Sequence, residues 1–326
     1  MVGSDDPTPA RSASTTIAYD LLAGGWYQEW LGALGLPMSL FPEVVDDSGI
    51  IAMTDPAVTG AETPITAAIA GQSAALFGQA CVRPGDAKTT HGTGTFLDVN
   101  TGTEPVISQH GLSTIVAWRR DGVTTYGLEG YAPVTGSAVQ WLRDGAELLT
   151  DAAETEELAR GVRDNNGVYF VPALTGLGAP SWDSSARGLL IGLTPGTIRG
   201  HLARAALEGI VYSIKDFIEL MSEESGQAVT TMRADGGASA NDFLLQFQAD
   251  MLGATIHRPS NVEATASGAA YLAGLGVGIW SDPQDCFRAT GDDAVFTPSM
   301  DDAVRDANYT QWQRAVERAK GWAVQP

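Results

Sequence analysis

Residues 229–253 read VTTMRADGGASANDFLLQFQADMLG, and this stretch predicts a strand, a glycine turn and a helix. A turn of this kind lets the backbone approach a ligand closely, and the helix N-terminus that follows presents free N–H groups to an anion. An ordinary tight turn in which Asn241 caps the helix explains the same residues equally well. The stretch therefore predicts an α/β unit and leaves ligand binding open at this point.

A second glycine-rich turn lies earlier in the chain, in residues 90–96, THGTGTF. Gly92 and Gly94 permit a tight, exposed turn, and Thr93 offers a hydroxyl and an N–H to a phosphate. A plain β-hairpin turn is the alternative interpretation. Two such loops in one chain favour a nucleotide-binding protein more strongly than either loop does alone.

Strands and helices alternate around these two loops. Residues 111–130 predict two strands joined at Asp121-Gly122, which is a strong hairpin signal. Residues 201–221 predict a long helix with one apolar stripe, and residues 255–259 predict another strand. This alternation predicts an α/β fold.

The composition restricts the function classes. The chain has 39 acidic and 19 basic residues and a net charge of -20, which argues against nucleic acid and anionic membranes as partners. The two cysteines, Cys81 and Cys286, fit neither a disulfide framework nor a metal site, and no secretory signal or membrane span is evident, so we expect a cytoplasmic protein. The dispersed acid and scarce lysine predict a halophilic surface; an ordinary acidic protein is the alternative.

Three further segments match a known family. Residues 188–208, GLLIGLTPGTIRGHLARAALE, have the spacing of the second signature of the FGGY carbohydrate kinases. Residues 171–188, VPALTGLGAPSWDSSARG, and residues 265–280, TASGAAYLAGLGVGIW, are similar to the glycerol kinase branch of that family. The resemblance runs from about residue 12 to the C-terminus.

The resemblance implies an α/β nucleotide-binding domain of the actin/hexokinase/Hsp70-like (ribonuclease H-like) type, ATP or ADP with Mg²⁺ as cofactors, and phosphorylation of a polyol hydroxyl. Glycerol is the first candidate substrate, ahead of a sugar such as xylulose or gluconate. No metal-binding carboxylate can be assigned. The residues that the resemblance places against the nucleotide are Thr93, for the phosphates, Gly136 and Gln140, beside the nucleotide, and Gly237 and Asn241, at the adenosine.

The chain departs from the family pattern in its active-site segment. The family reads Gly-Asp-Gln-Gln-Ala-Ala-Leu-Phe-Gly there, whereas residues 70–78 read AGQSAALFG. The resemblance therefore places Gly71 where the catalytic Asp would be, keeps Gln72 as a substrate-binding residue and assigns no catalytic residue. Asp55, Glu62 and Asp98 are the other carboxylates considered as a substitute base.

A second departure concerns the N-terminus. No phosphate-binding hairpin of the Asp-x-Gly-Thr-Thr type precedes residue 12, so we expect residues 1–78 to comprise a disordered first dozen residues and a remnant of the family's N-terminal domain. Residues 79–326 would form the C-terminal nucleotide-binding domain. These departures leave two main hypotheses: an impaired kinase that pairs with a separate N-terminal half or forms a homo-oligomer, and an inactive pseudokinase that binds nucleotide or a partner. A third, a truncated gene product without a selected role, is disfavoured by the consistent periodicity from residue 15 onward.

Overall fold

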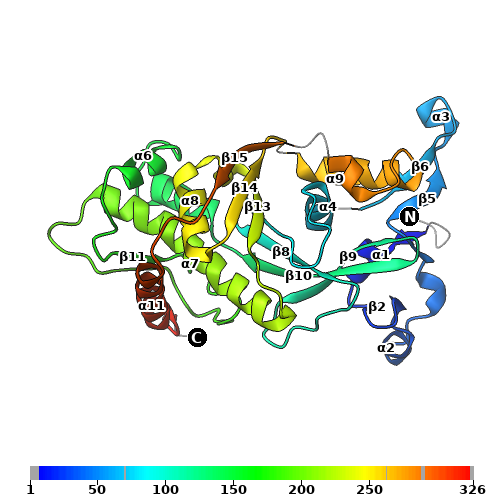
Figure 1. Ribbon diagram of the computed structural model, residues 1–326. Helices are drawn as coiled ribbons and strands as arrows, with labels where there is room; N and C mark the ends of the chain where they lie inside the picture. The colour runs from blue at the N-terminus through cyan, green and yellow to red at the C-terminus, as the bar shows by residue number, and fades with distance from the viewer. Residues whose placement is uncertain (1–6, 70, 262, 288–290, 324–326) are drawn as a thin grey trace.

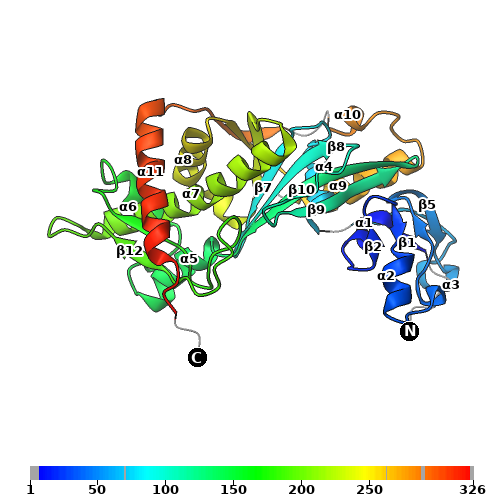
Figure 2. The same cartoon turned by 90° about the horizontal axis from the view of Figure 1, so that it is seen from below.

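A computed structural model describes residues 7–69, 71–261, 263–287 and 291–323. A mixed sheet runs through the molecule, with helices on both faces (Figures 1 and 2). In spatial order its nine strands are β15 (Asp292–Phe296), β14 (Thr255–Pro259), β13 (Thr231–Asp235), β7 (Ala87–His91), β8 (Thr95–Gly102), β10 (Val123–Ala132), β9 (Ser113–Arg120), β5 (Ser48–Met53) and β6 (Pro64–Ala67).

The centre of the sheet mixes parallel and antiparallel pairs. Strand β13 runs parallel to both β14 and β7, whereas β7, β8, β10 and β9 form an antiparallel series. The predicted hairpin is confirmed: Arg120 pairs with Val123, and Asp121 and Gly122 both have positive φ (53° and 73°), as a two-residue type I′ turn requires.

The larger core lies between the sheet and a layer of helices formed by α7 (Arg199–Ser225), α8 (Asp242–Leu252) and α11 (Asp302–Ala319). The predicted apolar stripe of α7 is buried there, including Ile210, Ile214 and Met221. Two other helices, α4 (Gly71–Gly78) and α9 (Ala264–Gly276), lie side by side, away from this core (Figure 1). They contribute to a second, smaller core, in which Leu76, Phe77 and Leu272 pack with Trp118 of β9.

Small elements complete the described residues. The two-stranded sheets pair β1 (Thr8–Pro9) with β4 (Val44–Val45), β2 (Tyr19–Asp20) with β3 (Gly25–Trp26), and β11 (Tyr169–Val171) with β12 (Leu189–Ile191). The remaining helices are α1 (Ala10–Ser14), α2 (Gln28–Ala33), α3 (Pro56–Thr59), α5 (Gly136–Gln140), α6 (Glu154–Arg160) and α10 (Pro283–Cys286), with short 3-10 turns at Met38–Leu40 and Gly237–Ala240 and one π turn at Trp141–Gly145.

The N-terminal region differs from expectation. Residues 8–12, expected to be disordered, belong to β1 and α1, because β1 pairs with β4 and Ala10 and Arg11 are buried. Residues 1–6 lie outside the described residues. Strand β5 was not predicted from the sequence, and it pairs with β9 through Ser48 and Arg120. Its exposed side chains, such as Ile50, gave no alternating pattern from which a strand could be predicted.

Candidate functional site

Three loops meet at the end of the central strands. The first is the turn at Gly92 and Thr93 between β7 and β8, and the second is the start of α5. They are joined by hydrogen bonds: Thr135 and Ser137 donate their N–H groups to the Thr93 carbonyl (3.0 and 3.1 Å), and Gly136 donates to the Gly92 carbonyl (3.0 Å). The third loop is the glycine turn after β13, which the sequence predicted. These bonds hold the first two loops in a fixed relation.

Glycine is required where the loops touch. A Cβ atom on Gly136 would lie 2.7 Å from the Gly92 carbonyl oxygen. A Cβ atom on Gly236 would lie 2.5 Å from the His91 carbonyl oxygen, and the φ of Gly236 is +85°, which favours glycine independently. The two glycines therefore let the backbones of the three loops approach more closely than any larger residue would allow.

A buried polar network supports the first loop from behind. His91 is fully buried, and its ring nitrogens contact Gln248 Oε1 (2.9 Å) and Thr95 Oγ1 (3.0 Å). Thr95 in turn contacts the Thr135 hydroxyl at 2.7 Å. Burial lowers the pKa of His91 to about 4, so the imidazole is neutral near pH 7. This network positions the loops and adds no charge.

The three loops line a cavity of about 630 Å³. All five residues that the resemblance assigned to the nucleotide lie on its wall: Thr93, Gly136, Gln140, Gly237 and Asn241. Asn241 also caps α8, with its Oδ1 accepting from Leu244 N (3.0 Å), so the cap interpretation is confirmed as well. A single side chain can serve both purposes because its Nδ2 group donates elsewhere, to Thr155 Oγ1 (3.2 Å).

Several lining residues were missed by sequence reasoning. Arg143 and the segment around α6 contribute polar groups, and Leu207 and Ile210 of α7 with Leu244 of α8 contribute apolar ones. Thr155 and Glu156 also line the cavity, and Glu156 Oε2 accepts from Asp242 N at 3.2 Å, which connects α6 to α8. Leu207 and Leu244 lie in the segments 188–208 and 229–253 and Ile210 lies on the predicted apolar stripe, but no pattern assigned them to a ligand. Arg143, Thr155 and Glu156 lie in none of the quoted motifs.

The cavity suits a nucleotide. Its volume is within the usual range of about 300–1,000 Å³ for small-molecule sites, and it joins an apolar wall to glycine loops whose backbone N–H groups can meet phosphates. Within the ranges that the structure describes, no group of three or more His, Cys, Asp or Glu side chains could hold a metal ion.

The other two predicted residues lie on α4. Gln72 is half-buried, and its Oε1 accepts a hydrogen bond from Lys88 Nζ. Gly71 begins α4, is exposed and has a φ of +59°. A Cβ atom at position 71 would meet no described atom within 4 Å, so the backbone leaves open space at the position to which the resemblance assigns the family's acid.

Two of the three other carboxylates considered as a base already have partners. Asp55 caps α3 by accepting from Ala57 N (2.8 Å), and Glu62 is exposed in the same β5–β6 projection (Figure 1). Asp98 is fully buried and pairs with Lys88 at 2.5 Å. The hypothesis of a substitute base is thus left with no support at Asp55 or Glu62, and Asp98 is already paired.

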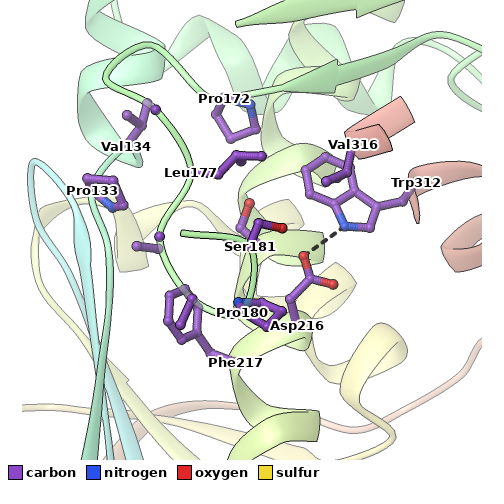
Figure 3. A pocket seen from close by; sticks show the side chains of 15 residues that line it. Pro133, Val134, Pro172, Leu177, Pro180, Ser181, Asp216, Phe217, Trp312 and Val316 are labelled. Carbon is purple, nitrogen blue, oxygen red and sulfur yellow. Dashed lines mark hydrogen bonds between the residues drawn. The ribbon is translucent and has the colours of Figure 1, made fainter. Parts of the chain in front are cut away.

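A smaller cavity of about 40 Å³ lies between α7, α11 and residues 133–134 and 172–181 (Figure 3). Asp216 beside it accepts from Trp312 Nε1 (3.0 Å) and Tyr309 Oη (2.6 Å), which ties α11 to α7. Burial raises the pKa of Asp216 to about 6. The cavity is too small for a nucleotide, so these contacts serve the packing of α11.

The described helices include none with the length and apolar character needed to cross a bilayer.

Residues 87–277 match the model of the FGGY family of carbohydrate kinases, C-terminal domain. The chain is 48% identical over 315 residues to a glycerol kinase of Petrotoga mobilis and 49% identical over 316 residues to one of Dechloromonas aromatica. Each alignment covers 97% of this chain and 63% of the relative, so the chain spans less than two thirds of those proteins.

Solved structures agree with the sequence match. A Plasmodium falciparum glycerol kinase with ADP superimposes with a TM-score of 0.91 at 33% identity, covering 99% of this chain and 64% of that one. A xylulose kinase of Lactobacillus acidophilus, at 21% identity and a TM-score of 0.86, shares the fold. The predicted actin/hexokinase-like α/β fold is therefore confirmed, and the chain belongs to the FGGY family of carbohydrate kinases.

Proposed function

We propose that the cavity binds ATP or ADP with Mg²⁺, with the phosphates at the Gly92-Thr93 turn and the adenosine between Gly237 and Asn241. One observation carries this proposal: five residues assigned to the nucleotide on sequence grounds alone, spread over about half of the chain, line a single cavity. The Plasmodium falciparum glycerol kinase that shares this fold was solved with ADP, which supports the choice of ligand.

We further propose that the acceptor is a polyol of the glycerol class and that phosphoryl transfer is impaired. The relatives named glycerol kinase support the substrate class. Gly71 supports the impairment, because a glycine cannot accept the proton of the attacking hydroxyl. A positioned general base contributes typically about 10²–10⁴-fold to a rate, so transfer would be slow.

A pseudokinase that binds nucleotide and a partner is the second candidate, and Gly71 favours it too. Exposed apolar side chains are concentrated in the N-terminal region, including Ile17, Leu22, Leu40, Ile50 and Val58. Such a concentration suits a protein interface, either with a separate N-terminal half or with a second copy. In this second proposal residues 1–78 act as the partner-binding remnant and residues 79–326 as the nucleotide-binding domain.

The cellular setting follows from composition. Cys81 and Cys286 are both free and buried, which suits a reducing compartment such as the cytoplasm. The excess of acidic over basic residues supports a surface adapted to high salt.

Calorimetric titration of the purified chain with Mg-ADP and Mg-ATP, in low and in molar salt, tests the nucleotide proposal. Asn241→Ala should weaken binding, whereas Gln284→Ala, in the short helix α10, should not. A glycerol phosphorylation assay on the same samples separates the two candidates: slow turnover supports the impaired kinase, and binding without turnover supports the pseudokinase. Absence of nucleotide binding at either salt concentration would refute both.

A further inference from the structure

Lys88 lies fully buried on the sheet face that carries α4. Its neighbours across the strands are Asp98 on β8 and, beyond it, Glu129 on β10, as the pairing registers show. Leu97 and Val99 flank Asp98 in sequence and belong to the larger core, between the sheet and helices α7, α8 and α11. Because side chains alternate along a strand, Asp98 and its neighbour Lys88 point to the other face, under α4.

The Lys88 ammonium group forms an ion pair with Asp98 (Nζ to Oδ2, 2.5 Å). It also donates hydrogen bonds to Thr90 Oγ1 (3.2 Å) and to Gln72 Oε1. A lysine ammonium group has no acceptor, so the Gln72 side chain must direct its carbonyl oxygen toward Lys88. This reasoning fixes the orientation of the carboxamide without relying on how its oxygen and nitrogen were assigned.

The Gln72 Nε2 group is left pointing away from Lys88. Among the residues that the structure describes, none accepts a hydrogen bond from it. Gln72 is half-exposed at the start of α4, next to Gly71. Its two N–H donors are therefore available to a ligand at the position where the family has its catalytic acid.

We propose that Lys88 is a positioning residue that holds Gln72 as a hydrogen-bond donor to a hydroxyl oxygen of the acceptor polyol. The inference rests on the proposed function, because it needs the polyol beside α4. It deepens that function by assigning the direction of one hydrogen bond. A hydroxyl whose oxygen accepts from Gln72 has its own proton free to point elsewhere, toward position 71. Gln72 itself cannot replace the carboxylate, because a carboxamide is too weak a base to take the proton of a hydroxyl.

A test of this proposal must remove Lys88 without leaving its ion-pair partner Asp98 buried and unpaired. Removing one member of a buried ion pair leaves an unpaired charge, which is strongly destabilising, whereas replacing both members with apolar residues is often neutral. The test variant is therefore the double substitution Lys88→Met with Asp98→Leu, which removes the pair together. Lys215→Met with Glu219→Leu is the matched control, because it removes a lysine–carboxylate pair (2.7 Å) on α7, away from α4.

The measurement is the dissociation constant of glycerol in the presence of saturating Mg-ADP, with that of Mg-ADP itself measured alongside. We expect the double variant to weaken glycerol binding about tenfold, as loss of one well-placed hydrogen bond would, while Mg-ADP binding and the control variant stay unchanged. Gln72→Leu should have the same effect. Combining it with the double variant should add nothing, because Lys88 acts only through Gln72.

Additive losses in the combined variant, or unchanged glycerol binding in a folded double variant, would overturn the inference. If the double variant does not fold, the wild-type protein decides: the Gln72 side-chain amide protons, assigned by their loss in Gln72→Leu, must shift on adding glycerol to the Mg-ADP complex. A wild type that binds Mg-ADP but not glycerol refutes this inference alone. A wild type that binds neither refutes the proposed function itself.

Discussion

The nucleotide cavity and the start of α4 are built in opposite ways. At the cavity, the loops are joined by backbone hydrogen bonds, and a single added carbon at Gly136 or Gly236 would collide with a neighbouring carbonyl. At the start of α4, Gly71 is exposed, and an added carbon would meet no described atom. A side chain at Gly136 or Gly236 would collide with its surroundings, whereas position 71 has room for the aspartate of the family pattern.

The structure around position 71 bears on the proposed impairment of phosphoryl transfer. The residues around position 71 keep their places: Gln72 is still held by Lys88, and α4 still packs on α9. If Gly71 stands at the family's acid, as the resemblance implies, a carboxylate is absent from a backbone that has room for one. A single substitution then tests how much of the transfer rate depends on that carboxylate.

The largest effect is expected from Gly71→Asp. Aspartate tolerates the left-handed backbone better than most residues, and the open space at position 71 accommodates it. If transfer is limited by the missing proton acceptor, the rate of glycerol phosphorylation should rise by about 10²–10⁴-fold. The assay is formation of ADP at saturating Mg-ATP and glycerol.

Gly60→Asp is the matched control for this substitution, because Gly60 also has positive φ (82°) and open space but lies at the end of α3. It should leave the rate unchanged. A Gly71→Asp variant that binds nucleotide and shows no gain in rate would make the comparison incomplete, because more than the carboxylate would then be missing, and it would favour the pseudokinase.

A loss of affinity is expected at the rigid region. Gly136→Val would force the second loop away from the Gly92 carbonyl, and overpacking of this kind costs about 1–3 kcal/mol. If the whole cost falls on nucleotide binding, Mg-ADP affinity should drop by about 5–150-fold. Gly32→Ala, whose added carbon meets no described atom, is the control. Unchanged affinity in a folded Gly136→Val variant would show that the loops do not need their close contact.

We expect pH to change the unfolding free energy of the chain through Glu129 and to leave its nucleotide affinity unchanged. Burial, followed by the charge of Asp98, raises the pKa of Glu129 from its ordinary value of 4.5 to about 7. Between these values the folded chain binds more protons than the unfolded chain, so the unfolding free energy should fall as pH rises from about 5 to 7. Nucleotide affinity should stay level from pH 6 to 8, because His91 is already neutral there.

Urea denaturation at several pH values measures this slope. Glu129→Gln should make it shallower, whereas Glu62→Gln, at an exposed position, should leave it unchanged. A Glu129→Gln variant with the wild-type slope would contradict the assignment of this pH dependence to Glu129.

The smallest effect is expected from salt. Because the net charge is -20, molar KCl should screen self-repulsion and raise the melting temperature by a few degrees. The charge is spread over the whole surface, so wild type and Gly136→Val should gain equally and the difference between them should persist. A melting temperature that is independent of salt would argue against a halophilic surface.

Local sequence patterns predicted the parts of the fold that depend on neighbouring residues. The type I′ turn at Asp121-Gly122 and the glycine turn before α8 require particular residue types, so the sequence reveals them. The contact between Lys88 and Gln72 was not predictable, because it joins two elements that only the tertiary fold brings together. The same holds for Thr155 on the cavity wall and for β5, which has no apolar alternation.

The claim that the cavity is the nucleotide site is tested most directly by amide hydrogen exchange with and without Mg-ADP. We predict that the ligand slows exchange in three segments, residues 90–95, 134–143 and 236–244, and leaves the β5–β6 projection, residues 48–67, unchanged. Slower exchange confined to other segments, or no change at saturating nucleotide, would contradict the assignment of this cavity.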